Sequence, residues 1–237
     1  MRWRGWWGPA VVMFAVVAGC SYSPLALPVS AASAWLETSS SSPLETSLKR
    51  AERHFITQYH HARWNPNETR FDNANCGPAA LAMALKAYGR EPKDLADRSA
   101  SGLISRVRRA MTGTTEDDNW TYPVQVLLAA PRFGLRAEYV FGVVEIRRAM
   151  RRAGRMVVLN LNPTPAYVHL LTRPYDGGHF ALLTAVNGDR ATLCDPLASS
   201  PVMISLGQLA QALATPLGEH SDGRLIPPFN GGVLLWE

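Results

Sequence analysis

Cysteine is scarce in this chain of 237 residues: only three are present, and so few exclude a scaffold held together by disulfide bonds. No internal repeat is visible, which excludes a solenoid. The net charge is +5, but the basic residues are not interleaved with aromatic ones. We therefore interpret Arg106, Arg108 and Arg109, like the arginines of residues 147–152, as solvated faces of helices, and we expect no nucleic-acid partner.

Clusters of metal-ligating side chains are also lacking. Residues 116–118 are three successive carboxylates, but no further ligands follow at the spacing of a calcium-binding loop. A solvated loop is therefore favoured at this place, and we expect neither a metal ion nor a cofactor.

The first residues have the pattern of a targeting segment. Residues 1–19 carry two arginines and then an apolar run that is short for a membrane-spanning helix. Residues 17–20, Val-Ala-Gly-Cys, resemble a bacterial lipobox, and this resemblance implies lipidation at Cys20. The alternative is ordinary secretion with cleavage near residues 30–32.

The lipobox leads us to expect a lipoprotein of the bacterial cell envelope. Ser21 follows the cysteine, which by resemblance to known sorting rules permits the periplasmic face of the outer membrane. Residues 20–43 are rich in Ser, Pro and Ala and predict a flexible tether. Residues 44–237 are then long enough for one domain with its own core.

Residues 75–89 predict a helix whose two ends are defined by the sequence. Asn75 suits the N-cap, Pro78 is tolerated in the first turn, and Gly89 suits the position after the last turn. Between them lie strong helix formers with almost no charge, so the helix should be buried on most sides. Cys76 lies at its N-terminus, where the helix dipole favours a negatively charged group. Such a cysteine is either a packing residue or a nucleophile.

The order of predicted elements is a helical half followed by a half rich in strands. We expect helices at residues 44–61, 76–88, 102–111, 123–130, 144–153 and 204–214, and strands at residues 135–141, 156–161, 179–186, 191–195 and 232–236. This order predicts an α+β domain with a cleft between its two halves.

A nucleophilic cysteine needs a base and a group that orients the base. Among six histidines, only His179 begins a predicted strand directly after a Gly-Gly pair. Asp195 ends the next strand, and it shares a face with His179 only if the hairpin loop is odd-numbered or the hairpin carries a bulge. A plain two-residue turn at residues 187–188 would pair Asp195 with Phe180 instead. The same alternation points Cys194 away from the site, into the core.

These segments together resemble a known family. Residues 75–83 (Asn-Cys-Gly-Pro-Ala-Ala-Leu-Ala-Met), followed by residues 178–184 (Gly-His-Phe-Ala-Leu-Leu-Thr) and then Asp195-Pro196, resemble the bacteriocin-processing-like cysteine peptidases. The resemblance covers about residues 50–200. It implies a papain-like fold in which Cys76 is the nucleophile, His179 is the general base and acid, and Asp195 orients His179.

One part of the family's pattern is missing. The family usually carries a glutamine for the oxyanion hole a few residues before the cysteine, and residues 70–75 contain none. Gln58 is the nearest upstream glutamine and is therefore our candidate for the oxyanion donor. Asn73 and Asn75 are the alternatives.

The expected function is hydrolysis of a peptide or amide bond by a Cys-His-Asp triad through a thioester. Two alternatives stay open: acyl transfer to an amine by the same triad, and a catalytically silent lipoprotein that binds peptides. The loop of residues 163–178, with Tyr167 and Tyr175, either lines the cleft before His179 or packs as a surface loop.

Overall fold

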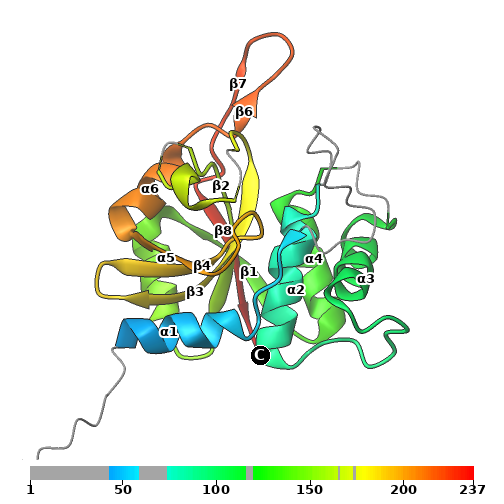
Figure 1. The fold of residues 1–237 in the computed structure, drawn as a ribbon. Coiled ribbons are helices and arrows are strands. Elements are labelled where there is room, and N and C mark those ends of the chain that lie inside the picture. The colour runs from blue at the N-terminus through cyan, green and yellow to red at the C-terminus, as the bar shows by residue number, and fades with distance from the viewer. Residues whose placement is uncertain (1–42, 59–73, 116–119, 165, 173–174) are drawn as a thin grey trace, which may run out of the picture. The chain divides into compact units, whose positions relative to one another are not determined.

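A six-stranded antiparallel sheet, with strands in the order β1-β8-β2-β3-β4-β5, runs through the computed structural model of this chain (Figure 1). The structure describes residues 43–58, 74–115, 120–164, 166–172 and 175–237, all within one compact unit, Ser41–Glu237. The expected signal peptide, the lipidation of Cys20 and the carboxylates of residues 116–118 lie outside the described residues and stay predictions. So does the expected tether, except for Pro43, which begins the first helix.

The elements have the following bounds. The helices are α1 (Pro43–Glu52), α2 (Cys76–Tyr88), α3 (Ala100–Thr112), α4 (Pro123–Ala129), α5 (Gly142–Met150) and α6 (Leu206–Ala214), with short 3-10 helices η2 (Ala130–Phe133) and η3 (Val168–Leu170). The strands are β1 (Arg136–Phe141), β2 (Met156–Leu161), β3 (His179–Asn187), β4 (Arg190–Cys194), β5 (Val202–Ser205), β6 (Gly218–Glu219), β7 (Leu225–Ile226) and β8 (Gly231–Trp236). None of the described helices is both long and apolar enough to cross a membrane.

Helices cover both faces of the sheet, because side chains alternate along each strand. One core joins α1, α2, α3 and α4 to one face through Val158, Leu182, Cys194 and Leu235. The other core joins α5 and α6 to the opposite face. It uses residues that are adjacent in the strands to those of the first core, such as Leu159, Leu183 and Leu193. The predicted α+β class, with the cysteine-bearing helix packed on an antiparallel sheet, is confirmed.

Helix α2 is the central element of the first core. Every side chain from Ala79 to Leu85 is fully buried, as its charge-free sequence predicts. Full burial of Leu81, Met83 or Leu85 stabilises the fold by roughly 1.5–3 kcal/mol each. Gly89 ends the helix with φ of 63°, in the left-handed region that glycine adopts without strain. The predicted bounds of this helix are therefore confirmed, and its burial fixes the position of Cys76.

The β3–β4 hairpin carries the bulge on which the assignment of Asp195 depended. Its turn is two residues, Gly188 and Asp189, since Asn187 pairs with Arg190. An unbroken ladder from this turn would set Asp195 opposite Leu182, on the face away from His179. The register shifts around Thr184, so that Leu183 pairs with Leu193 and Leu182 with Cys194. The next position sets Asp195 opposite Ala181, on the same face as His179.

Several predicted bounds were wrong. Helix α1 ends at Glu52 rather than near residue 61, and Ile56 turns into the first core instead of continuing the helix. The short strands β5, β6 and β7 were missed, and α5 ends at Met150 rather than at residue 153.

The predicted C-terminal strand is present as β8, and it is an interior strand that pairs with both β1 and β2. Gly232 permits this close pairing, because a Cβ at this position would lie 2.5 Å from the carbonyl oxygen of Val158.

Candidate active site

Cys76 is the first residue of α2 and is half-buried. The carbonyl of the N-cap residue Asn75 accepts the backbone N–H of Ala79 at 2.8 Å, which begins the helix at the cysteine. Gly77 is needed beside it, since a Cβ there would lie 2.5 Å from the side-chain oxygen of Thr121. The Cys-Gly-Pro sequence therefore lets the segment before α4 approach the thiol closely.

The side chain of Asn75 does not cap the helix, although the residue type predicts that it would. Its Oδ1 instead accepts a hydrogen bond at 3.1 Å from the guanidinium of Arg108, which also donates to the carbonyl of Ala74 at 3.0 Å. Arg108 is fully buried, so its assignment to a solvated helix face was wrong. A buried cation thus holds the two residues that lead into Cys76.

His179 and Asp195 form a buried pair. His179 is 1% exposed and Asp195 is 0% exposed, and the Nε2 of His179 lies 2.7 Å from Oδ1 of Asp195. The backbone N–H of Leu197 donates to the same Oδ1 at 2.8 Å. Because Nε2 is engaged by the carboxylate, Nδ1 is the ring nitrogen left to serve a reacting group. The ring of Tyr175 lies against the imidazole, with 5.5 Å between ring centroids.

The pKa of His179 shows how strongly its neighbours act on it. Burial has the largest single effect and lowers the pKa. The carboxylate of Asp195 and the thiol of Cys76 oppose it, and the net result is a pKa raised from 6.5 to about 10. The imidazole is therefore protonated at neutral pH. The three residues named from the sequence thus form one electrostatic unit.

Gln58, the oxyanion donor expected from the sequence, is one of the residues that line the site. It is buried, and it lines the same cavity as Cys76 and His179. Its backbone N–H donates to the carbonyl of Pro196 at 3.0 Å, which ties this segment to the residue after Asp195. Of the alternatives, Asn75 is engaged by Arg108, and Asn73 lies outside the described residues.

The cavity beside these residues has a volume of about 720 Å³. Trp120 and Tyr122 line one wall, while Leu217 and the β6–β7 hairpin line another, so residues from both halves of the domain form the cleft. Of the two alternatives for the loop of residues 163–178, Tyr175 follows the first and lines the cavity, whereas Tyr167 is fully buried in the second core. The hydroxyl of Tyr167 donates to Oδ2 of Asp195 at 2.8 Å.

Two residues of this site were missed. Nothing in the sequence around Tyr167 distinguished it from a cleft-lining aromatic residue. Arg108 did carry a signal, since it follows Ile104 by four residues and precedes Met111 by three, on the buried face of α3.

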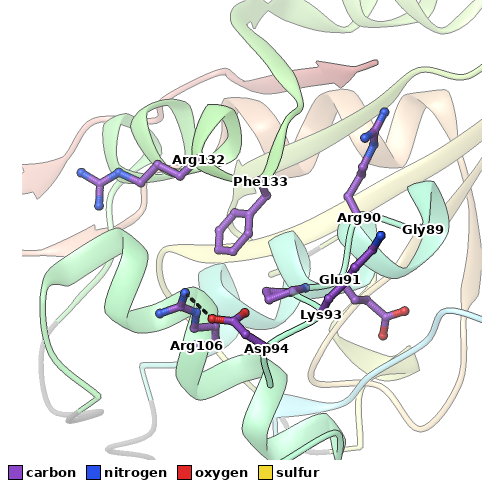
Figure 2. Close-up of a pocket in the computed structure, with 9 residues that line it drawn as sticks. Gly89, Arg90, Glu91, Lys93, Asp94, Arg106, Arg132 and Phe133 are labelled. Atoms are coloured by element: carbon purple, nitrogen blue, oxygen red, sulfur yellow. Dashed lines mark hydrogen bonds and ion pairs between the residues drawn. The ribbon is translucent and has the colours of Figure 1, made fainter. Parts of the chain in front are cut away.

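A second hollow, of about 360 Å³, lies at the other end of α2. Figure 2 shows its charged side chains pointing in different directions, with Arg106 paired to Asp94. Neither a cysteine nor a histidine lines it, so it does not hold the pair of residue types found in the first cavity. Within the part of the chain that the structure describes, no three side chains of the metal-ligating types gather closely enough to hold an ion.

No family model matches this chain, and no curated protein matches it. It is similar to a double-glycine-motif protease from an AMS/PCAT transporter, solved with its leader peptide, at 17% identity and a TM-score of 0.43, covering 75% of this chain and 97% of that one. It is similar to the peptidase domain of Streptococcus ComA at 15% identity and a TM-score of 0.45, covering 70% and 94%.

A C39-like peptidase from Bacillus anthracis is similar at 14% identity and a TM-score of 0.49, covering 79% of this chain and 95% of that one. All three TM-scores lie below 0.5. The function proposed below therefore stands on this chain's own side chains.

The buried guanidinium yields a prediction about stability. Replacing Arg108 by Met, which has a similar length, should lower the free energy of unfolding by about 2–4 kcal/mol, because one buried and one partly buried acceptor lose a charged donor. Chemical denaturation of the two purified proteins measures the difference. Arg109→Met is the matched control, since Arg109 is exposed on the same helix and its loss should change stability by about 0.5 kcal/mol or less. Equal effects of the two substitutions would contradict the prediction.

Proposed function

We propose that this chain is a cysteine peptidase of papain-like fold that hydrolyses a peptide or amide bond through a thioester at Cys76. The observation that carries the proposal is the buried, charge-coupled arrangement of His179 with Asp195 and Cys76 at the edge of an open cleft. A structural histidine needs no such coupling to a half-exposed thiol. An acid and a nucleophile beside a peptide-sized cavity are what acyl chemistry requires.

The first half-reaction follows from the protonation of His179. With the proton on the imidazole, the sulfur of Cys76 attacks the carbonyl carbon as a thiolate, and a carbon–sulfur bond forms. The helix N-terminus favours this negative charge. The Cys76 N–H and the Gln58 side chain donate to the oxyanion. His179 then gives its proton to the leaving amine as the carbon–nitrogen bond breaks.

The second half-reaction reverses these roles. His179, now neutral, takes a proton from a water molecule that attacks the thioester carbon. The carbon–sulfur bond breaks, the carboxylic acid leaves, and the thiolate–imidazolium pair is restored. Asp195 accepts the Nε2–H throughout, so the ring keeps Nδ1 towards the reaction.

Covalent labelling tests the nucleophile. A thiol-reactive acyl probe should label the wild-type chain and fail to label Cys76→Ala. Cys194→Ala is the matched control and should keep the label, because Cys194 is buried in the first core, where burial and, to a lesser extent, the charge of Asp195 together raise its pKa to about 12. Labelling that survives in Cys76→Ala at any residue other than Cys20 would refute the proposal.

The same samples separate the other two functions. Incubation of the acylated chain with and without an added amine, followed by product analysis, distinguishes acyl transfer from hydrolysis. A wild-type chain that binds peptides but forms no acyl-enzyme would favour the silent binder.

The oxyanion role of Gln58 predicts a loss of kcat. Gln58→Ala should lower kcat by roughly 10²–10³, with little change in KM, because one donor acts mainly in the transition state. Its backbone bond to Pro196 is retained in this variant. Gln211→Ala, at an exposed position of α6, serves as the control. A kcat within twofold of wild type would assign the oxyanion hole to other donors.

The raised pKa of His179 predicts the alkaline limit of activity. The imidazolium is the acid for the leaving amine, so kcat/KM should fall as pH rises through about 10. Asp195→Asn removes the carboxylate that raises this pKa, so this alkaline limb of the pH–rate profile should move to lower pH. Asp189→Asn, at the exposed turn of the same hairpin, should leave the limb in place. A pH–rate profile of each variant decides, and an unmoved limb in Asp195→Asn would contradict the assigned roles.

A further inference from the structure

The carboxylate of Asp195 is fully buried, and each of its oxygens meets a donor. Oδ1 accepts from His179 and from the backbone N–H of Leu197, and Oδ2 accepts from the hydroxyl of Tyr167 at 2.8 Å. Rotation about the Cβ–Cγ bond would move both oxygens together, and the two donors on Oδ1 oppose it through one oxygen only. The hydroxyl of Tyr167 opposes the same rotation through Oδ2 and so adds a second restraint on the plane of the carboxylate.

Tyr167 is fixed in place by burial and by hydrogen bonds of the backbone around it. Its side chain is fully buried in the second core, and its backbone N–H donates to the carbonyl of Pro163 at 2.9 Å. The carbonyl of Ala166 accepts from the side chain of Gln208, on α6, at 3.1 Å. A rigid tyrosine with one hydrogen-bonding direction is suited to set the plane of a carboxylate.

The loop of Tyr167 also forms a backbone hydrogen bond with the segment that carries Asp195. The backbone N–H of Thr172 donates to the carbonyl of Leu197 at 2.9 Å. The loop therefore contacts the Asp195 segment twice, once at the carboxylate through Tyr167 and once at the backbone of Leu197. We infer that Tyr167 is a positioning residue that fixes the carboxylate of Asp195 against the imidazole of His179, extending the triad by a fourth member.

The ionisable groups around the carboxylate are consistent with this role. They are His179 on β3, Cys194 on β4 and Tyr167 itself. Cys76 and Tyr175 lie on the other side of His179 and interact with that residue. Burial raises the pKa of Tyr167 well above its usual value of 10, and the charge of Asp195 raises it further. The phenol thus keeps its proton and stays a donor throughout the working range of the site.

This inference rests on the proposed function for its kinetic test and is independent of it for its spectroscopic test. The variant is Tyr167→Phe, which removes one oxygen and keeps the ring. The control is Tyr88→Phe, because the hydroxyl of Tyr88 also bonds to buried backbone, at 2.8 Å from the carbonyl oxygen of Leu235, away from the cleft. Both variants should lose some stability, measured by chemical denaturation.

The first readout is the NMR signal of the His179 Nε2 proton, which a 2.7 Å bond to a carboxylate shifts far downfield and protects from exchange. In Tyr167→Phe this signal should broaden through faster exchange, and in Tyr88→Phe it should match wild type. The second readout is the kinetic split, in which Tyr167→Phe lowers kcat about tenfold and leaves KM within twofold.

An unchanged Nε2 signal in Tyr167→Phe would overturn the inference, whatever the activity of the protein. A Tyr167→Phe chain that does not fold would assign the hydroxyl to stability alone and would overturn it as well. If no variant hydrolyses a peptide but the signal broadens as expected, the positioning role stands and the proposed function fails.

Discussion

A buried carboxylate is the constraint on which this site depends. Taking the charge of Asp195 out of water costs several kcal/mol unless donors replace the lost hydration. The structure supplies three of them: His179, the backbone of Leu197 and Tyr167. In the proposed function each also serves the chemistry, because a carboxylate that is held in one orientation keeps the imidazole in one orientation. The same contacts therefore lower the cost of burial and define the geometry of the acid.

Residues 195–197 accept hydrogen bonds from segments that are far apart in the sequence. The backbone of Gln58 donates to Pro196, and the loop of Tyr167 reaches Asp195 and Leu197. One short segment thus fixes the orienting carboxylate, the candidate oxyanion donor and the loop behind the site. This explains how a glutamine so far before Cys76 reaches the cleft. Its position is set by tertiary hydrogen bonding and not by the helix that follows.

The sequence predicted the parts of this site that follow from local rules. The bounds of α2 follow from Asn75, Pro78 and Gly89, and the need for a bulge before Asp195 follows from side-chain alternation. The location of the bulge at Thr184 did not follow, since a bulge depends on packing across the sheet as much as on its own residue.

Long-range contacts explain the other failures of prediction. Arg108 was assigned to solvent by its charge alone, whereas the acceptors that permit its burial lie more than 30 residues earlier. Strand β8 lies near the C-terminal end of the sequence but between β1 and β2 in the sheet, which only the pairing of distant strands can determine. Arg108 donates to the two residues before Cys76, and neutral donors surround Asp195. A buried cation therefore fixes the segment that leads into the proposed nucleophile, and neutral donors fix the carboxylate beside the proposed base.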